Sequence, residues 1–354
     1  MYQPGKPLEE LERELGITGA IKVASNENPL GPSPRALAAL PAALAQLHRY
    51  PDAGGFALRR ALSVSIGCEI GQVALGNGSN DLLYQLVLAT CESTDEILTH
   101  KYSFLSYRLA AQVVGRPFVA APASAELACD VEALIAAITP CTKLIVVGTP
   151  NNPTGSVISR AGIERLITAL PARALLVLDE AYCDYAAMWP EVDHADGLAA
   201  QRSDPRVVVL RTFSKAYGLA GLRVGFAVAD KQVVDVLGRV GRTFHVSSLA
   251  LVGALAALDD TAHVARSAQH ARRTVERYAT EIRGPDARIY PSLANFVLID
   301  CGRPSTALYE RLLKRGVIVR PMAVWGLPNH LRLSVARDED VPRVIGAVNE
   351  VLAT

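Results

Sequence analysis

Three short, wholly apolar runs in the middle of the chain constrain its fold most. They cover residues 144–147, 174–178 and 207–210. Runs of four or five apolar residues without polar alternation are typical of strands buried on both faces of a parallel sheet. Helical stretches separate these runs, so the sequence predicts an α/β protein with a doubly wound sheet.

Polar residues follow each of these predicted strands. The first run leads to Asn152, the second is followed directly by Asp179, and the third precedes Lys215. Open α/β sheets bind ligands outside the carboxyl ends of their strands, so we expect these three side chains to share one crevice. A lysine among small and hydroxyl-bearing neighbours there could bind a carbonyl group covalently. An ordinary surface lysine is the alternative that this segment alone leaves open.

A glycine-rich loop at 76–80 precedes a predicted helix at 81–88. Free backbone N–H groups and the helix dipole attract an anion to such a helix N-terminus. Alone, such a loop is more often an ordinary turn and helix cap than a ligand site. Further along the chain, Thr212 and Ser214 can hydrogen-bond phosphate oxygens, and Arg223 supplies a cation. With the polar strand ends, the loop predicts a phosphate site.

A series of motifs extends along nearly the whole chain. They occupy residues 24–34, 50–52, 76–79, 150–155, 179–182, 211–223, 291–296 and 331–333. In this order the chain resembles the fold-type I, class-II pyridoxal-phosphate-dependent aminotransferases, most closely the histidinol-phosphate aminotransferase family. The resemblance implies a large doubly wound domain with a smaller α+β domain. It also implies transfer of the amino group of L-histidinol phosphate to 2-oxoglutarate, a step of histidine biosynthesis.

The resemblance assigns catalytic roles to four residues and a contact with the cofactor ring to a fifth. Lys215 would hold pyridoxal 5'-phosphate covalently and act as general base and acid. Asp179 would pair with the pyridinium nitrogen. Asn152 and Tyr182 would hydrogen-bond the phenolic oxygen of the ring, and Tyr107 would lie over the ring face. Without the resemblance, these residues are equally a helix cap, a turn residue and core tyrosines.

The resemblance also assigns a site for the cofactor phosphate. Its members lie at the helix N-terminus and after the third strand: Gly78, Ser79, Asn80, Thr212, Ser214 and Arg223. Tyr50 matches a family tyrosine that reaches the phosphate of the neighbouring subunit. The resemblance therefore implies a homodimer with shared sites.

Substrate recognition is assigned to the carboxyl-terminal part of the chain. Arg332 matches the arginine that binds the anionic end of the substrate, because a guanidinium fork suits carboxylate or phosphate. Arg320 would assist it. Tyr2 and Asn28 are further candidates, reached by an amino-terminal arm folded over the site. His245 stands where the family often has asparagine and could touch substrate, although a structural histidine is the interpretation we favour.

Composition sets limits on partners and location. A formal net charge of +1 over 354 residues gives no electrostatic footprint for nucleic acid. The six scattered cysteines lack metal-type spacing and suit a reducing cytosol, so we expect neither disulfides nor a metal site. The sequence shows no signal-peptide core, and its apolar runs are too short to cross a bilayer. We therefore expect a cytoplasmic enzyme with small-molecule partners and no membrane association.

The same pass along the chain predicts the domain organisation. Residues 1–45 form an N-terminal arm and part of the small domain, 46–245 the large cofactor-binding domain, and 246–354 the small C-terminal domain. Within the arm, leucines at helical spacing predict a short helix over 8–15, between Pro7 and Gly16.

Three alternative functions stay open from the sequence. The first is an aromatic amino acid aminotransferase, because that group shares most of the motifs. The second is a decarboxylase or lyase of the same fold and cofactor, against which Arg332 argues. The third is a ligand sensor that keeps the fold, against which the complete catalytic set argues.

Overall fold

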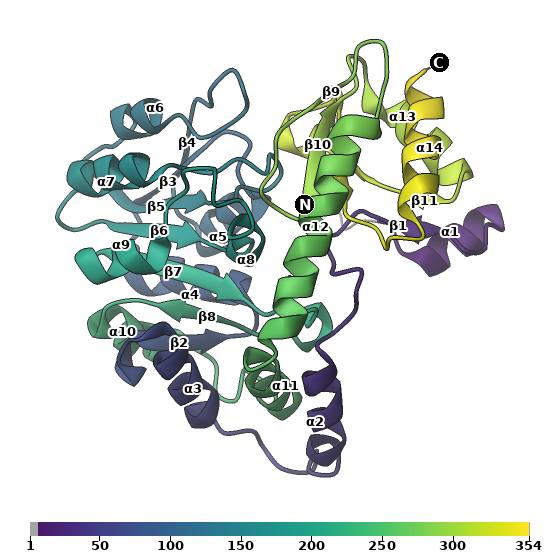
Figure 1. Cartoon of the computed structure of the whole chain (residues 1–354). Helices are drawn as coiled ribbons and strands as arrows, with labels where there is room; N and C mark the ends of the chain where they lie inside the picture. Colours follow the sequence, from purple (N-terminus) through teal and green to yellow (C-terminus); the bar gives the residue numbers. More distant parts are fainter. Residues whose placement is uncertain (1–5, 354) are drawn as a thin grey trace.

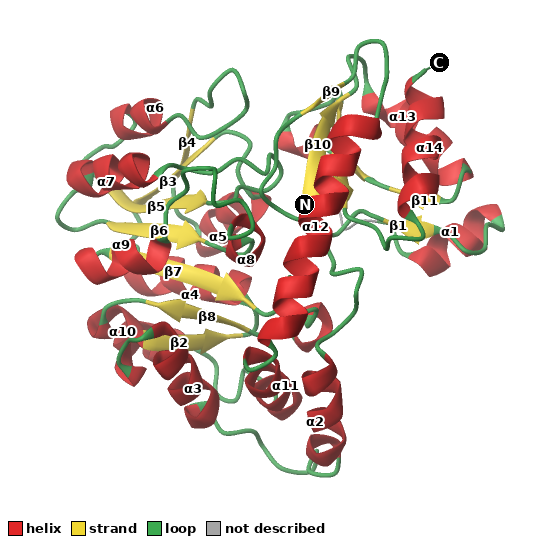
Figure 2. Cartoon of the chain, viewed as in Figure 1, coloured by secondary structure: helices red, strands yellow, loops and turns green. Residues whose placement is uncertain are grey.

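The structure, a computed structural model, describes residues 6–353. Two lobes are visible, a large one built on a seven-stranded sheet and a smaller one that contains the C-terminal elements (Figures 1 and 2). The predicted α/β class is confirmed.

Parallel strands form the centre of the large sheet, and almost all of their apolar side chains are buried. In sheet order the strands are β2 (Val73–Gly76), β8 (Gly225–Val228), β7 (Val207–Thr212), β6 (Leu175–Asp179), β5 (Thr142–Gly148), β3 (Glu96–His100) and β4 (Phe118–Ala121). Strand β8 runs antiparallel to both of its neighbours. The three apolar runs of the sequence are thus adjacent strands, and their carboxyl ends lie at one edge of the sheet.

Helices cover both faces of this sheet, as the absence of polar alternation in its central strands requires. One face packs against α4 (Ser79–Thr90), α5 (Leu105–Val114) and α10 (Lys231–Val240). The other packs against α2 (Pro34–Leu44), α3 (Phe56–Ile66), α6 (Val131–Ala136), α7 (Arg160–Ala169), α9 (Gly197–Ser203) and α11 (Ser248–Leu258). Short helices α8 (Cys183–Ala186), η1 (Ile70–Gln72) and η2 (Ala220–Leu222) complete this lobe.

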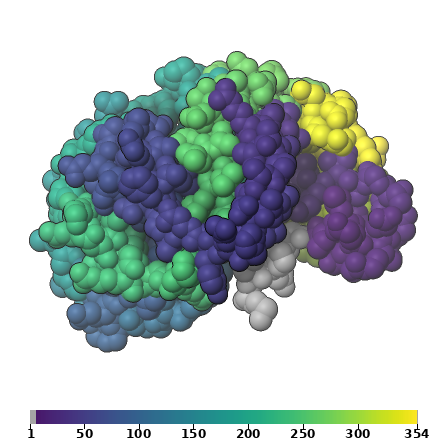
Figure 3. Space-filling view, turned by 90° about the horizontal axis from the view of Figure 1, so that it is seen from below, coloured from purple at the N-terminus to yellow at the C-terminus, as the bar shows by residue number. Residues whose placement is uncertain are grey.

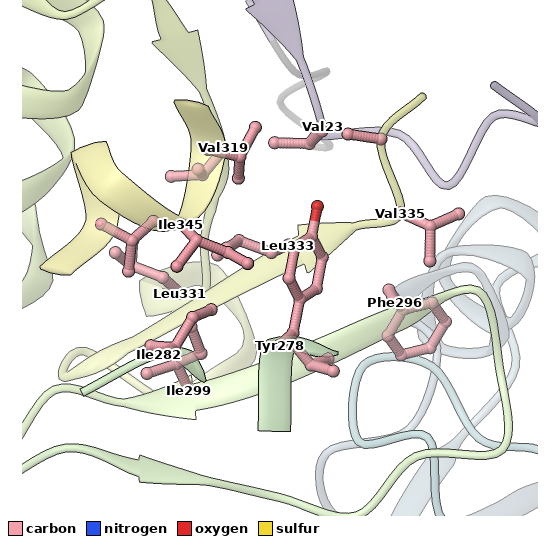
Figure 4. Close-up of a cluster of buried hydrophobic side chains, with 14 of the residues drawn as sticks. Val23, Tyr278, Ile282, Phe296, Ile299, Val319, Leu331, Leu333, Val335 and Ile345 are labelled. Carbon is pink, nitrogen blue, oxygen red and sulfur yellow. The ribbon is translucent and has the colours of Figure 1, made fainter. Parts of the chain in front are cut away.

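The small lobe is built on a four-stranded antiparallel sheet. Its order is β12 (Arg320–Pro321), β13 (His330–Ser334), β10 (Phe296–Asp300) and β9 (Arg288–Ile289). Around it lie α12 (Thr261–Glu281), α13 (Ser305–Lys314), α14 (Val341–Leu352) and η3 (Ala323–Trp325). Tyr278 of α12 points between Phe296 and Leu333 in the apolar core (Figure 4).

The N-terminal segment joins the small lobe. Helix α1 (Leu8–Leu15) begins after Pro7 and ends at Gly16, whose left-handed φ of 66° suits glycine. Leu11 packs with Leu313, whereas Leu8 and Leu15 are largely exposed. Next, β1 (Ile21–Lys22) pairs in parallel with β11 (Val317–Ile318). In Figure 3 the purple N-terminal residues lie against the yellow C-terminal ones.

Helices α2 and α11 lie just outside the predicted limits of the large domain, yet they pack together and share its core. Their apolar residues fill the same side of the large sheet as α3. The predicted domain limits at 46 and 245 stay predictions.

No single helix within residues 6–353 is both long and apolar enough to span a bilayer. Helices α11 and α12 are long and apolar enough only when taken as a pair, and the pair is bent by 82°.

Candidate active site

A cavity of about 180 Å³ lies at the carboxyl ends of β5, β6 and β7, between the two lobes. Eleven of the predicted site residues line it: Ser79, Asn80, Tyr107, Asn152, Asp179, Tyr182, Thr212, Ser214, Lys215, Arg223 and Arg332. Six residues that the sequence did not single out line it too: Ser25, Asn26, Phe104, Pro150, Ala181 and Trp325. The parallel strands thus bring together polar groups that lie far apart in the sequence.

One end of the cavity collects hydrogen-bond donors. Helix α4 begins at Ser79, and its N-cap Gly78 has a φ of 91° without a capping side chain. The Arg223 guanidinium lies so close that a Cβ on Gly78 would come 2.7 Å from its Nη2 atom. Arg223 also donates to Ser214 Oγ at 3.4 Å, and the Ser214 N–H donates to Thr212 Oγ1 at 3.1 Å. A helix N-terminus, hydroxyls and a guanidinium fit a phosphate group.

A buried carboxylate lies at the end of β6. Asp179 accepts hydrogen bonds from Tyr107 Oη at 3.0 Å and from the Ala181 N–H at 3.2 Å. Burial raises the pKa of Asp179 to about 6, against the opposing effects of these two bonds and of Lys215. A nearby cationic ring nitrogen would favour the charged form of this carboxylate.

Tyr107, for which we expect a place over the ring face, is one of the residues that line the cavity. Its side chain is buried, and its hydroxyl is engaged with Asp179. Phe104, one residue before α5, also lines the cavity and meets the Tyr107 ring edge to face at 5.9 Å. Because the two are three residues apart, they share one side of the chain entering α5. Phe104 is therefore an aromatic wall that the sequence analysis missed.

Lys215 lies close to two polar partners. Its Nζ donates to the Asn26 carbonyl at 3.2 Å and lies 5.5 Å from the centre of the Tyr182 ring. Tyr182 accepts a bond from Asn26 Nδ2 at 2.9 Å. Burial raises the pKa of Tyr182 to about 12, so its hydroxyl is protonated at neutral pH. The amine and the phenol can thus both exchange or hold protons inside one cavity.

Arg332 supplies a second cation, on the small-lobe side of the cavity. It lies on β13, is 5% exposed, and donates to Asn152 Oδ1 and to the Ala24 carbonyl. Arg320 is its direct cross-strand partner, so both side chains leave the sheet on the same side. The Arg320 guanidinium lies over Trp325, 5.4 Å from the ring centre, and does not line the cavity.

The other predicted residues lie outside the cavity lining. Asn28 donates to the Ala216 carbonyl at 2.9 Å and to Ser267 Oγ at 2.8 Å. Tyr50 is 82% exposed and stacks on Phe244 with 4.7 Å between ring centres. The two ring nitrogens of His245 lie against the carbonyls of residues 242 and 75, away from the cavity. Tyr2 falls outside the described residues.

Comparison with known proteins places the chain among enzymes. Residues 18–348 match the family described as aminotransferase class I and II. Histidinol-phosphate aminotransferase 1 of Nitrosococcus oceani is 43% identical over 351 residues, which cover 99% of this chain and 94% of that protein. Histidinol-phosphate aminotransferase 2 of Pseudomonas aeruginosa is 44% identical over 355 residues, with coverages of 99% and 95%.

Solved structures agree with these relatives. The crystal structure of histidinol-phosphate aminotransferase from Sinorhizobium meliloti, in complex with pyridoxal-5'-phosphate, superposes with a TM-score of 0.90. It is 29% identical, and the alignment covers 99% of this chain and 95% of that one. Aspartate aminotransferase from Thermus thermophilus with maleate has a TM-score of 0.85 at 24% identity, over 98% of this chain and 97% of that one, which shows the same fold.

Proposed function

This chain belongs to the class I and II aminotransferases, and from that premise we propose that it transfers the amino group of L-histidinol phosphate to 2-oxoglutarate, with pyridoxal phosphate as its cofactor. The observation that carries the proposal is the placement of two cationic sites around Lys215 and Asp179. Arg223 lies on the large lobe and Arg332 on the small lobe, both in one cavity. One can bind the phosphate of the cofactor and the other the anionic end of the substrate.

The donor set supports pyridoxal phosphate as the occupant. Its phosphate would bind at Ser79, Asn80, Thr212, Ser214 and Arg223, with Gly78 leaving the space that the Arg223 guanidinium fills. When bound, the cofactor supplies a ring that accepts the electrons left when the substrate loses a proton. Asp179 would hold the proton on the ring nitrogen. Phe104 would supply the apolar wall beside the ring.

The remaining groups would manage protons and orientation. Lys215 Nζ would hold the cofactor covalently at rest and, once displaced by the substrate amine, carry the proton taken from its carbon. Asn152 and Tyr182 would hydrogen-bond the phenolic oxygen of the ring. Arg332 links Asn152 to the small lobe, so binding of an anion at Arg332 would also affect the ring contact.

The substrate proposal rests on charge. A phosphate monoester carries more negative charge than a carboxylate and offers three acceptor oxygens, so a buried guanidinium favours it through charge-assisted hydrogen bonds. Arg320, beside Arg332 on the neighbouring strand, adds a second positive charge behind the cavity wall. Incubating the protein with a panel of amines and 2-oxoglutarate, and measuring glutamate, tests the proposal. A higher specificity constant for phenylalanine or tyrosine than for histidinol phosphate would favour an aromatic aminotransferase instead.

Replacing Arg332 with lysine is expected to raise the KM for histidinol phosphate about tenfold or more. The substitution keeps the positive charge but removes the forked pair of N–H donors. The expected loss of binding free energy is that of one charge-assisted hydrogen bond, about 1.5 kcal/mol. Steady-state kinetics measure the effect. Arg337→Lys is the matched control, because Arg337 is an exposed partner of Asp340 on the loop after β13. An unchanged KM in Arg332→Lys would exclude Arg332 as the anion site.

We also propose that the active unit is a homodimer in which Tyr50 reaches the phosphate of the neighbouring subunit. Tyr50 and Phe244 form an exposed aromatic pair on the large lobe, beyond reach of their own cavity lining. Exposed aromatic pairs are enriched at protein interfaces. A cytoplasmic location stays a prediction.

Tyr50→Phe tests the shared site, because it keeps the stacking on Phe244 and removes only the hydroxyl. We expect weaker retention of pyridoxal phosphate on dialysis. Mixing Tyr50→Phe with Lys215→Ala should give hybrid dimers with one intact site and therefore more activity than the two parents combined. If mixing adds no activity although hybrids are present by native mass spectrometry, Tyr50 serves its own subunit or none.

A further inference from the structure

Asn26 is a buried polar residue of the cavity wall that the proposed function does not use. It lies between β1 and α2, is 1% exposed, and has a left-handed φ of 53°. Among residues other than glycine, asparagine and aspartate adopt this conformation most readily. Its backbone and side chain contact both lobes, so its role cannot be read from the N-terminal segment alone.

Two hydrogen bonds with Ser334 fix the orientation of the Asn26 amide. The Asn26 N–H donates to Ser334 Oγ at 2.8 Å, so the serine oxygen is an acceptor there. The Ser334 hydroxyl then donates its single proton to Asn26 Oδ1, also at 2.8 Å. Oδ1 therefore faces Ser334, and the Nδ2 group faces the opposite direction.

This orientation determines where the hydroxyl proton of Tyr182 can point. Asn26 Nδ2 donates to Tyr182 Oη at 2.9 Å, so the phenolic oxygen accepts on that side. The phenolic proton is then available for a partner in the cavity that Tyr182 lines. The carbonyl of Asn26 accepts from Lys215 Nζ at 3.2 Å and from Asn295 Nδ2 at 3.1 Å. Asn26 thus contacts both Lys215 and Tyr182, the two groups that carry or hold a proton in the proposed function.

The chain of contacts also reaches the substrate side. Ser334 lies two residues after Arg332 on β13, so the two side chains point to the same face of this strand. We propose that Asn26 is a positioning residue: it holds Tyr182 with its O–H directed at the ring oxygen of the cofactor, and it ties that orientation to the strand that carries Arg332. The proposal rests on the proposed function, because it takes the occupant of the cavity from it.

Asn26→Asp tests the proposal with little change in size or backbone preference. The carboxylate can only accept, so it would draw the Tyr182 proton toward itself and away from the ring oxygen. A hydrogen bond to that oxygen stabilises its deprotonated form, so losing it raises the pH at which the oxygen titrates. We expect the pH midpoint of the absorbance change of the pyridoxal-phosphate-loaded protein to rise by about one unit or more, the scale of one hydrogen bond. We also expect kcat to fall more than KM rises.

The new negative charge near Lys215 could shift the midpoint by itself, so the same change is made in a Tyr182→Phe background. In that background, the midpoint shift caused by Asn26→Asp should fall to less than about a third of its size in the protein that keeps Tyr182. The reason is that the Tyr182 hydroxyl, through which Asn26 acts, is absent. An equal shift in both backgrounds, or no shift in either, would overturn the proposal. A wild-type protein that shows neither cofactor absorbance nor glutamate formation would instead contradict the proposed function.

Ser334→Ala keeps the proposal testable if Asn26→Asp does not fold. It removes the acceptor and donor that fix the amide, without adding charge, so we expect a smaller shift in the same direction that also disappears in the Tyr182→Phe background. Thermal unfolding of the cofactor-free variants checks that each is folded. A Ser334→Ala shift that persists without the Tyr182 hydroxyl would contradict the coupling.

Discussion

Replacing Lys215 with alanine is expected to lower kcat by a factor of roughly 10⁴ or more, because general acid–base catalysis by one group alone contributes up to about that much. The substitution also removes the covalent hold on the cofactor. The phosphate contacts from Ser79, Thr212, Ser214 and Arg223 do not involve Lys215, so the variant should fold and still bind some pyridoxal phosphate. Glutamate formation and cofactor absorbance measure the two effects.

Borohydride reduction separates this role from a general loss of structure. Reduction should attach pyridoxal phosphate permanently to the wild type, which mass spectrometry detects as a mass increase. The Lys215→Ala variant should show no such increase. Lys143→Ala is the matched control, because Lys143 lies near the start of β5 and donates to the Arg173 carbonyl on the far edge of the sheet. Turnover of Lys215→Ala near the wild-type rate would remove Lys215 from the site.

Replacing Asp179 with asparagine is expected to lower kcat by a factor of about 10² to 10³, the scale of one lost electrostatic contact in a buried catalytic site. The amide keeps the size of the side chain but cannot hold the proton on the ring nitrogen. Pre-steady-state kinetics, which measure the rate of proton removal from the substrate, should show the same decrease. Asp184→Asn is a control, since Asp184 is another carboxylate after β6 and does not line the cavity. Equal rates for wild type and Asp179→Asn would exclude the proposed contact.

The same substitution should stabilise the cofactor-free protein at neutral pH. Burial raises the pKa of Asp179 from 3.8 to about 6, so between these values the unfolded chain binds fewer protons than the folded one. Stability therefore falls as pH rises from about 4 to 6, by a contribution of roughly 1–3 kcal/mol. Thermal unfolding should show Asp179→Asn as the more stable protein at pH 7, with the difference lost below about pH 4.

Much of the site follows from local sequence patterns. Asn152, Asp179 and Lys215 each follow a run of apolar residues, and parallel pairing of β5, β6 and β7 places the ends of such runs together. The proposed phosphate site also starts from a local pattern, because backbone N–H groups at the N-terminus of a helix after a glycine-rich loop attract anions. Patterns of this kind need no information about distant parts of the chain.

The residues that were missed depend on contacts between distant segments. Asn26 meets Tyr182 across 156 positions and Ser334 across 308, and a single asparagine carries no sign of either partner. The direction of the Tyr107 hydroxyl depends on how α5 packs beside β6, which periodicity does not determine. Arg320, expected to assist Arg332, lies opposite it on β12, but its guanidinium lies over the Trp325 ring and not in the cavity lining.

The contact of the N-terminal segment with β13 has a consequence for biosynthesis of the chain. Asn26 is synthesised 308 residues before its partner Ser334. Strand β1 likewise cannot pair until β11, almost 300 residues later in the sequence, has been synthesised. Large-lobe strands can pair while synthesis continues, since domains fold as units during translation. A nascent chain could therefore form the large-lobe side of the cavity first, but it would complete the wall around Lys215 only after β13 is made.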